Sequence, residues 1–154
     1  MKLALNLFFV FAILAAACGQ TAARPTQMQA SPLPEKVGTA TLSETGCNLE
    51  TANQLPLHEV TFSLVNKTTY TGHFAFAKIQ DGYTIKDVID YWNSPTGKIV
   101  HPSFITQVRQ ADVVANGTRE VVVPLVLKGS YALGCVYADE TNNVMGFFQE
   151  LKAG

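Results

Sequence analysis

Apolar and polar residues alternate over short runs from residue 37 to the end of the chain, and turn residues separate these runs. The clearest run is 58–65, in which Val60, Phe62 and Leu64 alternate with polar residues. Alternation with a period of two places one face of a strand in a core and the other in solvent. Many short strands joined by turns predict an all-β sandwich. The further strand-like runs are 73–79, 104–108, 119–127, 130–138 and 145–151.

One segment departs from this pattern and predicts a short helix. Thr84 and Asp87 have the spacing of a capping box, in which each residue satisfies a backbone N–H at the start of a helix. Apolar residues then recur at i, i+3, i+4 and i+7 and form one stripe, and the Ser94-Pro95 pair ends the pattern. We expect this stripe to pack against the sandwich. Its members are Ile85, Val88, Ile89 and Trp92.

Composition limits the classes of protein that the chain can represent. Its 154 residues suit one domain, and 47% hydrophobic with 15% charged residues is typical of a compact fold. The formal net charge is -1, and Lys and Arg are scattered along the chain. Because nucleic-acid binding needs a clustered basic surface, we exclude a nucleic-acid partner.

The amino-terminal segment predicts export. Lys2 precedes a run of uncharged residues, 3–17, which ends in three alanines followed by Cys18. A helix of this length spans about 22 Å, which is less than the roughly 30 Å of a bilayer core, so a signal peptide is favoured over a transmembrane helix. Small residues directly before a cysteine resemble a bacterial lipobox. That resemblance implies lipidation of Cys18 after removal of residues 1–17, and the alternative is ordinary cleavage without lipidation.

Residues 18–36 are expected to form a lipidated, flexible tether. This segment contains Pro25, Pro32 and Pro34 and has no aromatic residue and no apolar period. The folded domain is then expected to cover residues 37–154. In this interpretation a lipid anchors the protein to a membrane of the cell envelope, and the domain lies outside the cytoplasm.

The three cysteines suggest one disulfide. If Cys18 carries a lipid, then Cys47 and Cys135 remain as an even pair, and export to an oxidising compartment favours a bond between them. The alternative role for either cysteine is that of a thiolate metal ligand.

No enzymatic pattern is present in the sequence. A G-x-S-x-G nucleophile motif is absent, and His58, His73 and His101 lack the spacing of a metal-binding or catalytic pair. We therefore predict that the protein is not an enzyme.

Several motifs together resemble the cupredoxin family. Residues 129–135 (GSYALGC) followed by Met145-Gly146 resemble a cupredoxin ligand region, and residues 60–66 followed by His73 resemble its strand and first copper histidine. An early cysteine, a Thr-x-x-Asp helix, the segment 101–104 (HPSF) and a late cysteine also resemble exported bacterial cupredoxin-like proteins. The resemblance covers about 37–154 and implies a cupredoxin-like Greek-key β-sandwich with one short inserted helix.

The same resemblance implies copper ligands, but the set is incomplete here. Carried over residue by residue, it gives His73, Cys135 and Met145, whereas the second histidine is missing because 136–144 reads VYADETNNV. We therefore predict no metal and no cofactor. The alternative is a copper-handling or electron-transfer cupredoxin that recruits His101, or His58, as the fourth ligand.

The prediction for function is a non-enzymatic binding domain for a protein or small ligand that the sequence does not identify. Its candidate binding surface consists of Tyr91, Trp92, His101 and Phe104, which flank a long loop. The alternative is that these aromatic side chains only close one end of the sandwich.

Overall fold

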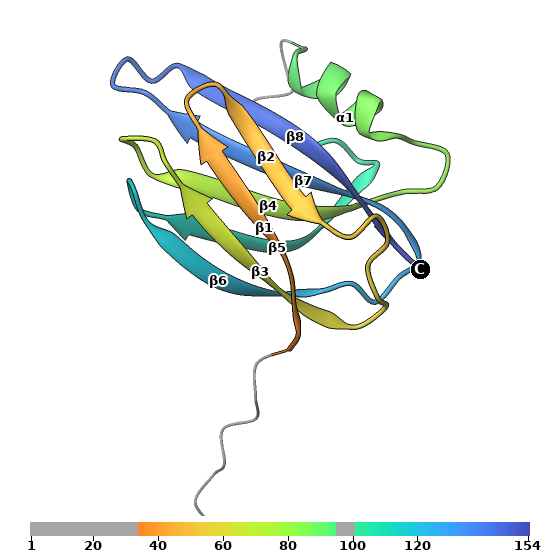
Figure 1. Cartoon of the computed structure of the whole chain (residues 1–154). Coiled ribbons are helices and arrows are strands. Elements are labelled where there is room, and N and C mark those ends of the chain that lie inside the picture. Colours follow the sequence, from red (N-terminus) through yellow and green to blue (C-terminus); the bar gives the residue numbers. More distant parts are fainter. Residues whose placement is uncertain (1–33, 95–100) are drawn as a thin grey trace, which may run out of the picture. The chain divides into compact units, whose positions relative to one another are not determined.

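The computed structural model describes residues 34–94 and 101–154, which contain eight strands and one helix (Figure 1). The predicted signal peptide, Cys18 and nearly all of the predicted tether lie outside these residues. The elements are β1 (Lys36–Ser43), β2 (Gly46–Thr51), β3 (Glu59–Asn66), β4 (Gly72–Ile79), α1 (Ile85–Trp92), β5 (Ile105–Val113), β6 (Thr118–Pro124), β7 (Gly129–Ala138) and β8 (Val144–Ala153).

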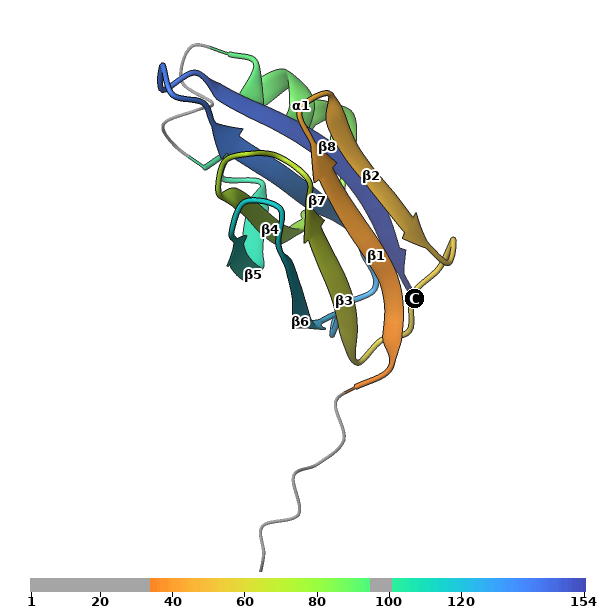
Figure 2. The same ribbon diagram turned by 60° about the vertical axis from the view of Figure 1, so that its left-hand side comes forward.

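The strands form two four-stranded sheets that pack face to face, as Figure 2 shows from a second side. Strand order is β2-β1-β3-β6 in the first sheet and β5-β4-β7-β8 in the second. β1 and β3 are parallel, and all other neighbouring strands are antiparallel. The chain crosses between the sheets after β3, β5 and β6, as in Greek-key sandwiches. The prediction of an all-β Greek-key sandwich with one inserted helix is confirmed.

The core lies between the two sheets. Phe62 of β3 and Phe76 of β4 are both buried, and their ring centroids are 5.1 Å apart across the sandwich. A disulfide joins Cys47 of β2 to Cys135 of β7, so that a covalent bond also links the two sheets. The predicted pairing of these cysteines is confirmed.

The first described residues already belong to the fold. The carbonyl of Glu35 accepts a hydrogen bond from the Thr61 N–H at 2.8 Å, and the carbonyl of Pro34 accepts one from the Thr61 hydroxyl at 2.6 Å. β1 begins at Lys36. The domain therefore includes the last three residues of the segment that the sequence assigned to the tether.

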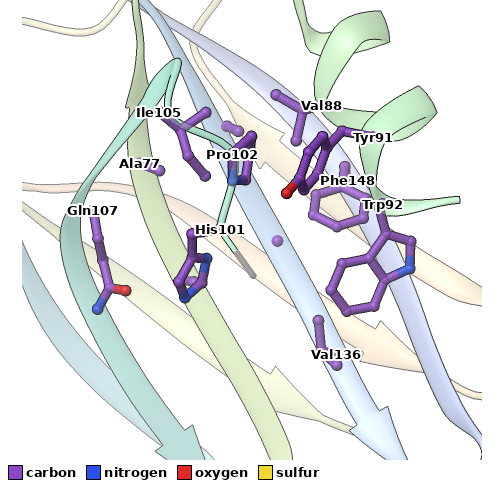
Figure 3. Close-up of a pocket in the computed structure, with 13 residues that line it drawn as sticks. Ala77, Val88, Tyr91, Trp92, His101, Pro102, Ile105, Gln107, Val136 and Phe148 are labelled. Atoms are coloured by element: carbon purple, nitrogen blue, oxygen red, sulfur yellow. The ribbon is translucent and has the colours of Figure 1, made fainter. Parts of the chain in front are cut away.

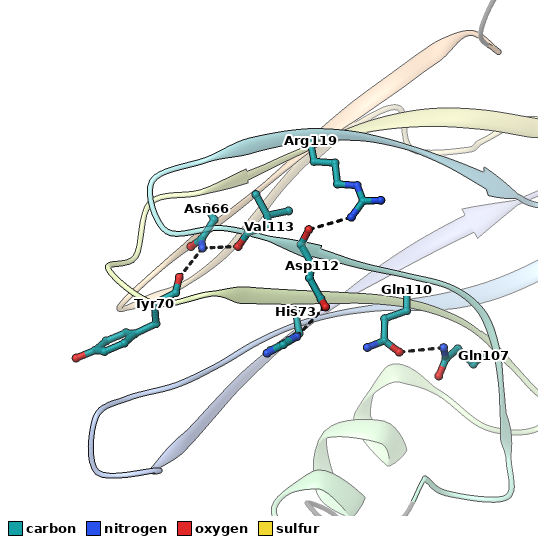
Figure 4. A network of polar contacts seen from close by, with 8 residues as sticks. All are labelled: Asn66, Tyr70, His73, Gln107, Gln110, Asp112, Val113 and Arg119. Atoms are coloured by element: carbon teal, nitrogen blue, oxygen red, sulfur yellow. Dashed lines mark hydrogen bonds and ion pairs between the residues drawn. The ribbon is translucent and has the colours of Figure 1, made fainter.

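Asn66 organises the end of the sandwich at which β3 finishes (Figure 4). Its buried side-chain amide donates to the backbone carbonyls of Tyr70 at 2.7 Å and Val113 at 3.0 Å. Its oxygen accepts the backbone N–H of Thr68 at 3.0 Å. One side chain thus holds the β3–β4 turn against the end of β5.

The helix forms where the sequence predicted it. The N–H and hydroxyl of Thr84 both donate to the Asp87 carboxylate at 2.7 Å, which fixes the first turn of α1. Val88 is buried and packs with Ile79 and Ala132 on the outer face of the second sheet.

In the described ranges, no helix has the length and apolar character needed to span a membrane.

Candidate functional site

The outer face of the second sheet has a floor of small residues. Ala75 pairs with Gly134, and Ala77 pairs with Ala132, so these four residues lie on one face of β4 and β7. The intervening residues face the core and are large or cross-linked, because Phe74, Phe76, Leu133 and Cys135 are all buried between the sheets. The alternation therefore fills the inner face and leaves the outer face hollow.

Aromatic residues form one wall of this hollow. Trp92, the last residue of α1, lies against Gly146 of β8, where an added Cβ would fall 2.6 Å from the indole. The ring of Phe148 meets the indole edge to face, with centroids 5.3 Å apart. Phe148 in turn covers Gly134, whose added Cβ would be 3.1 Å from its ring. Two glycines thus allow two aromatic rings to lie directly on the sheet.

The opposite wall comes from the segment that enters β5. Figure 3 shows His101, Pro102 and Gln107 on this side, facing Tyr91 and Trp92 across the sheet. The six-membered ring of the indole faces the hollow, whereas the indole nitrogen points away from His101. Together the walls and floor enclose a pocket of about 250 Å³. Its lining residues are Ala75, Ala77, Val88, Tyr91, Trp92, His101, Pro102, Ile105, Gln107, Ala132, Gly134, Val136 and Phe148.

The chemistry of the pocket is apolar with a few polar groups. Among the described residues that line it there is no Asp, Glu, Lys or Arg. Tyr91, His101 and Gln107 supply a hydroxyl, an imidazole and an amide. Such a site suits an uncharged ligand that offers apolar surface and one or two hydrogen-bonding groups.

Three of the four residues of the predicted binding surface line this pocket. Tyr91, Trp92 and His101 line it, whereas Phe104 does not. Phe104 instead stacks on Tyr83, with centroids 4.5 Å apart, and meets Tyr91 edge to face at 6.1 Å. Phe104 therefore packs against Tyr91, which lines the pocket, and does not line the pocket itself. Sequence reasoning missed the floor, because alanine and glycine in a strand give no recognisable binding signal.

The register separates His73 from Cys135. Phe74 pairs with Cys135, and His73 pairs with Val136, so His73 points to the outer face while Cys135 points to the core. Met145 packs against the core, on the side of Cys135. The structure thus brings Cys135 and Met145 to one face and places His73 on the other.

The donor set also does not fit a blue-copper site chemically. The sulfur of Cys135 is bonded to that of Cys47, so no thiolate is present. The Nδ1 atom of His73 lies 2.8 Å from a carboxylate oxygen of Asp112 on the neighbouring strand, where both side chains are exposed (Figure 4). In residues 34–94 and 101–154, no group of three His, Cys, Asp or Glu side chains could hold a metal ion.

The segment that replaces the second copper histidine forms a tight turn. Asp139 accepts hydrogen bonds from the Thr141 hydroxyl at 2.7 Å and from the Asn143 N–H at 2.9 Å. These bonds, that from the Thr141 hydroxyl first, lower the pKa of the exposed Asp139 carboxyl. One oxygen of this carboxylate caps its own turn, which gives the loop a structural role.

The other two histidines lie elsewhere. His101 lines the outer pocket, on the face of the second sheet that is opposite to Cys135. His58 precedes β3, and its carbonyl accepts the Leu125 N–H at 3.2 Å. Neither histidine shares a site with Cys135 and Met145 among the residues that the structure describes.

No family model and no curated protein matches the chain. Several solved structures are similar in fold. Reduced auracyanin from Roseiflexus castenholzii has a TM-score of 0.47 and 11% identity, over 75% of this chain and 94% of that chain. Auracyanin A, a "blue" copper protein from Chloroflexus aurantiacus, has a TM-score of 0.45 and 13% identity, over 75% of this chain and 96% of that chain. Auracyanin B has a TM-score of 0.46 and 13% identity, over 80% of this chain and 92% of that chain.

Proposed function

We propose that this protein is an extracytoplasmic lipoprotein, anchored through Cys18, whose cupredoxin-like domain binds an uncharged and mainly apolar ligand without catalysis. The observation that carries the proposal is the pocket on the outer face of the second sheet, with its aromatic wall above a floor of alanine and glycine. The binding position is thus distinct from the copper position that the family resemblance implies.

The lining selects against charged ligands. A charged group that leaves water without a partner of opposite charge carries a large desolvation penalty, and the described lining residues include no acid, lysine or arginine to offset it. Apolar surface against Trp92 and Phe148 is favourable, since aromatic side chains offer large and rigid contact areas. The ligand is therefore expected to be neutral.

The volume restricts the size of the ligand. About 250 Å³ is near the lower limit for small-molecule sites, which accommodate drug-sized molecules only from about 300 Å³ upward. One five- or six-membered ring with a few substituents fits this space, as does one apolar side chain of a peptide. The hydroxyl of Tyr91 and the side chains of His101 and Gln107 would then fix its orientation through hydrogen bonds.

Intrinsic fluorescence tests the proposal directly, because Trp92 is the only tryptophan of the chain and forms the wall of the pocket. We would titrate the protein with phenol and cyclohexanol, and with benzoate as a charged ring of similar size. The proposal requires a saturable change in Trp92 emission with the neutral rings and at least tenfold weaker binding of benzoate.

A matched pair of variants locates the binding. Val136→Phe enlarges a side chain that lines the pocket and should abolish the response. His73→Ala changes the residue that pairs with Val136 but does not line the pocket, and it should preserve the response. Absence of saturation across a wider panel of neutral ring compounds, or an undiminished response in Val136→Phe, would refute ligand binding at this site.

The anchor has its own test. The uncharged run 3–17 and the three alanines before Cys18 support lipidation. Cys18→Ser should move the protein from the membrane fraction to the soluble fraction, and mass spectrometry of the wild type should find acyl chains on the amino-terminal peptide. A wild-type protein that is soluble and carries an unmodified Cys18 thiol would refute the anchor.

A further inference from the structure

Exposed aliphatic side chains gather at one end of the sandwich. Among the described residues, five large hydrophobic side chains are exposed, and three of them lie in two loops. Leu57, in the loop between β2 and β3, is 47% exposed. Val126 and Leu127, in the loop between β6 and β7, are 65% and 59% exposed. We call these three residues the aliphatic end.

The two loops leave the first sheet at the same place. Glu59 pairs with Pro124 in the last pair of the β3–β6 ladder, and one loop continues from each strand. Beyond this pair, the Leu125 N–H still donates to the His58 carbonyl at 3.2 Å. The loop segments that carry Leu57 and Val126 are therefore held side by side.

The chain also enters the domain at this end. The carbonyls of Glu35 and Pro34 accept hydrogen bonds from Thr61, which lies two residues beyond Glu59 in β3. In Figures 1 and 2, the start of β1 lies at the same end as the β2–β3 and β6–β7 loops. In the sequence, 15 residues, 19–33, separate this entry point from Cys18.

We propose that the aliphatic end rests on the bilayer that holds the lipid on Cys18, so that the domain has a preferred orientation on the membrane. This inference rests on the anchor proposed above. If residues 19–33 form the flexible tether that the sequence predicts, their root-mean-square span is about 22 Å, and the anchor then keeps these loops close to the lipid surface. Tethering raises the effective concentration of the lipid surface near the domain. An apolar patch that is too weak to bind a membrane alone can then keep the domain in one orientation on it.

The charges of the two loops suit a lipid surface. Residues 52–58 and 125–128 contain no acidic residue, and their only permanently charged side chain is that of Lys128. Anionic lipid headgroups attract such a cation, and the aliphatic side chains can enter the boundary between headgroups and acyl chains. The exposed Glu35 and Glu59 lie next to the loops, just before β1 and at the start of β3. The pocket opens on the outer face of the second sheet, and this orientation leaves it accessible.

Val114 provides a matched control at the opposite end. It follows β5, its carbonyl accepts from the Asn66 amide at 3.1 Å, and its side chain is 70% exposed. β3 runs from Glu59 to Asn66, and eight residues of strand separate the two ends by about 25 Å. Val114 and Val126 are thus the same residue type, similarly exposed, at opposite ends of one strand ladder.

The test uses lipidated full-length protein in vesicles of phosphatidylethanolamine and phosphatidylglycerol that contain brominated lipid. Val126→Cys and Val114→Cys are each labelled with one fluorophore, which is selective because Cys47 and Cys135 are bonded to each other and Cys18 carries the lipid. We expect the label at 126 to be quenched several-fold more strongly than the label at 114. Replacing Leu57 and Leu127 by serine should reduce that difference.

Each outcome is decisive. Equal quenching of the two labels in protein that stays with the vesicles refutes the orientation and leaves the anchor intact. Protein that does not stay with the vesicles refutes the anchor and this inference together. Should the aliphatic end instead serve a soluble protein partner, the label at 126 would remain unquenched in these protein-free vesicles.

Discussion

The indole of Trp92 lies directly on the backbone of Gly146, so closely that a Cβ on Gly146 would fall 2.6 Å from two of its ring carbons. This contact fixes the last residue of α1 on β8 and positions the aromatic wall of the pocket. We expect Gly146→Ala to displace the indole, to weaken binding of neutral rings, and to lower the free energy of unfolding by about 1–3 kcal/mol.

Gly46→Ala is the control, because no atom lies within 4 Å of a Cβ added at Gly46. Trp92 emission and urea denaturation of the two variants would measure the effect. The seating of Trp92 on Gly146 would be contradicted if both variants kept the wild-type emission maximum and the wild-type stability.

The elements of this fold with strong local signals could be predicted from the sequence. The Thr84–Asp87 spacing and the apolar stripe gave α1 its start and its buried face, and Val88 is buried as expected. The cysteine count gave the pair Cys47 and Cys135. These signals are local or depend on counting, and neither requires knowledge of which strands are neighbours.

The candidate site depended on information that is not local. The motif that resembles cupredoxin ligands contains His73 and Cys135, yet a shift of one residue in register decides whether two side chains share a face. Sequence separation does not reveal that register. The pocket floor likewise exists only because β4 and β7 are neighbours and align Ala75 with Gly134.

Asn66 is expected to be the most sensitive polar residue of the core. Its amide holds the carbonyls of Tyr70 and Val113, and its oxygen holds the N–H of Thr68, in a region that excludes water. Asn66→Ala leaves these groups without their partner and should lower the free energy of unfolding by about 1–3 kcal/mol. Urea denaturation would measure the loss.

The exposed Asn48 is the matched control, since its amide donates only to the neighbouring Glu50 side chain at 3.3 Å. Asn48→Ala should change stability little. An Asn66→Ala protein as stable as Asn48→Ala would show that the network does not hold the turns together.

Acid should loosen the start of α1. The Thr84 hydroxyl, and then the Thr84 N–H, lower the pKa of the Asp87 carboxyl below its ordinary value of 3.8. Because the folded state binds the proton less tightly than the unfolded state, this contribution is complete above the ordinary pKa and is lost as pH falls through the lower, folded-state value. The protection factors of the amides in α1, which correct for the intrinsic pH dependence of exchange, should therefore fall below about pH 4.

The pKa of Asp87 can be measured by NMR titration of its carboxyl carbon. Thr84→Ala removes the hydroxyl donor and should raise this pKa toward its ordinary value. An unchanged Asp87 titration in Thr84→Ala would mean that the capping hydrogen bond does not form in solution.

Copper should not produce a blue site in this domain. The Cys135 sulfur is held in a disulfide. Cys135 points to the core, whereas His73 points to the outer face of the second sheet. Cys47→Ser releases the Cys135 thiol but leaves the register unchanged, so we expect no intense visible absorption on titration with copper(II) in either the wild type or this variant. The variant should lose up to about 4 kcal/mol of stability, because the disulfide closes a loop with a sequence separation of 88 residues.

The double variant Cys47→Ser/Cys135→Ser supplies the comparison, since it lacks both sulfurs and should behave as the single variant does on addition of copper. Circular dichroism would establish that each variant is folded before the titration. Weak, colourless binding at the exposed His73 or His58 is compatible with the register, because a single imidazole on a surface forms no copper–thiolate bond. An intense visible band in Cys47→Ser that disappears in the double variant would instead require Cys135 and a histidine to meet at one metal ion. The pairing of Phe74 with Cys135 would then be wrong, and the copper alternative would replace the ligand-binding proposal.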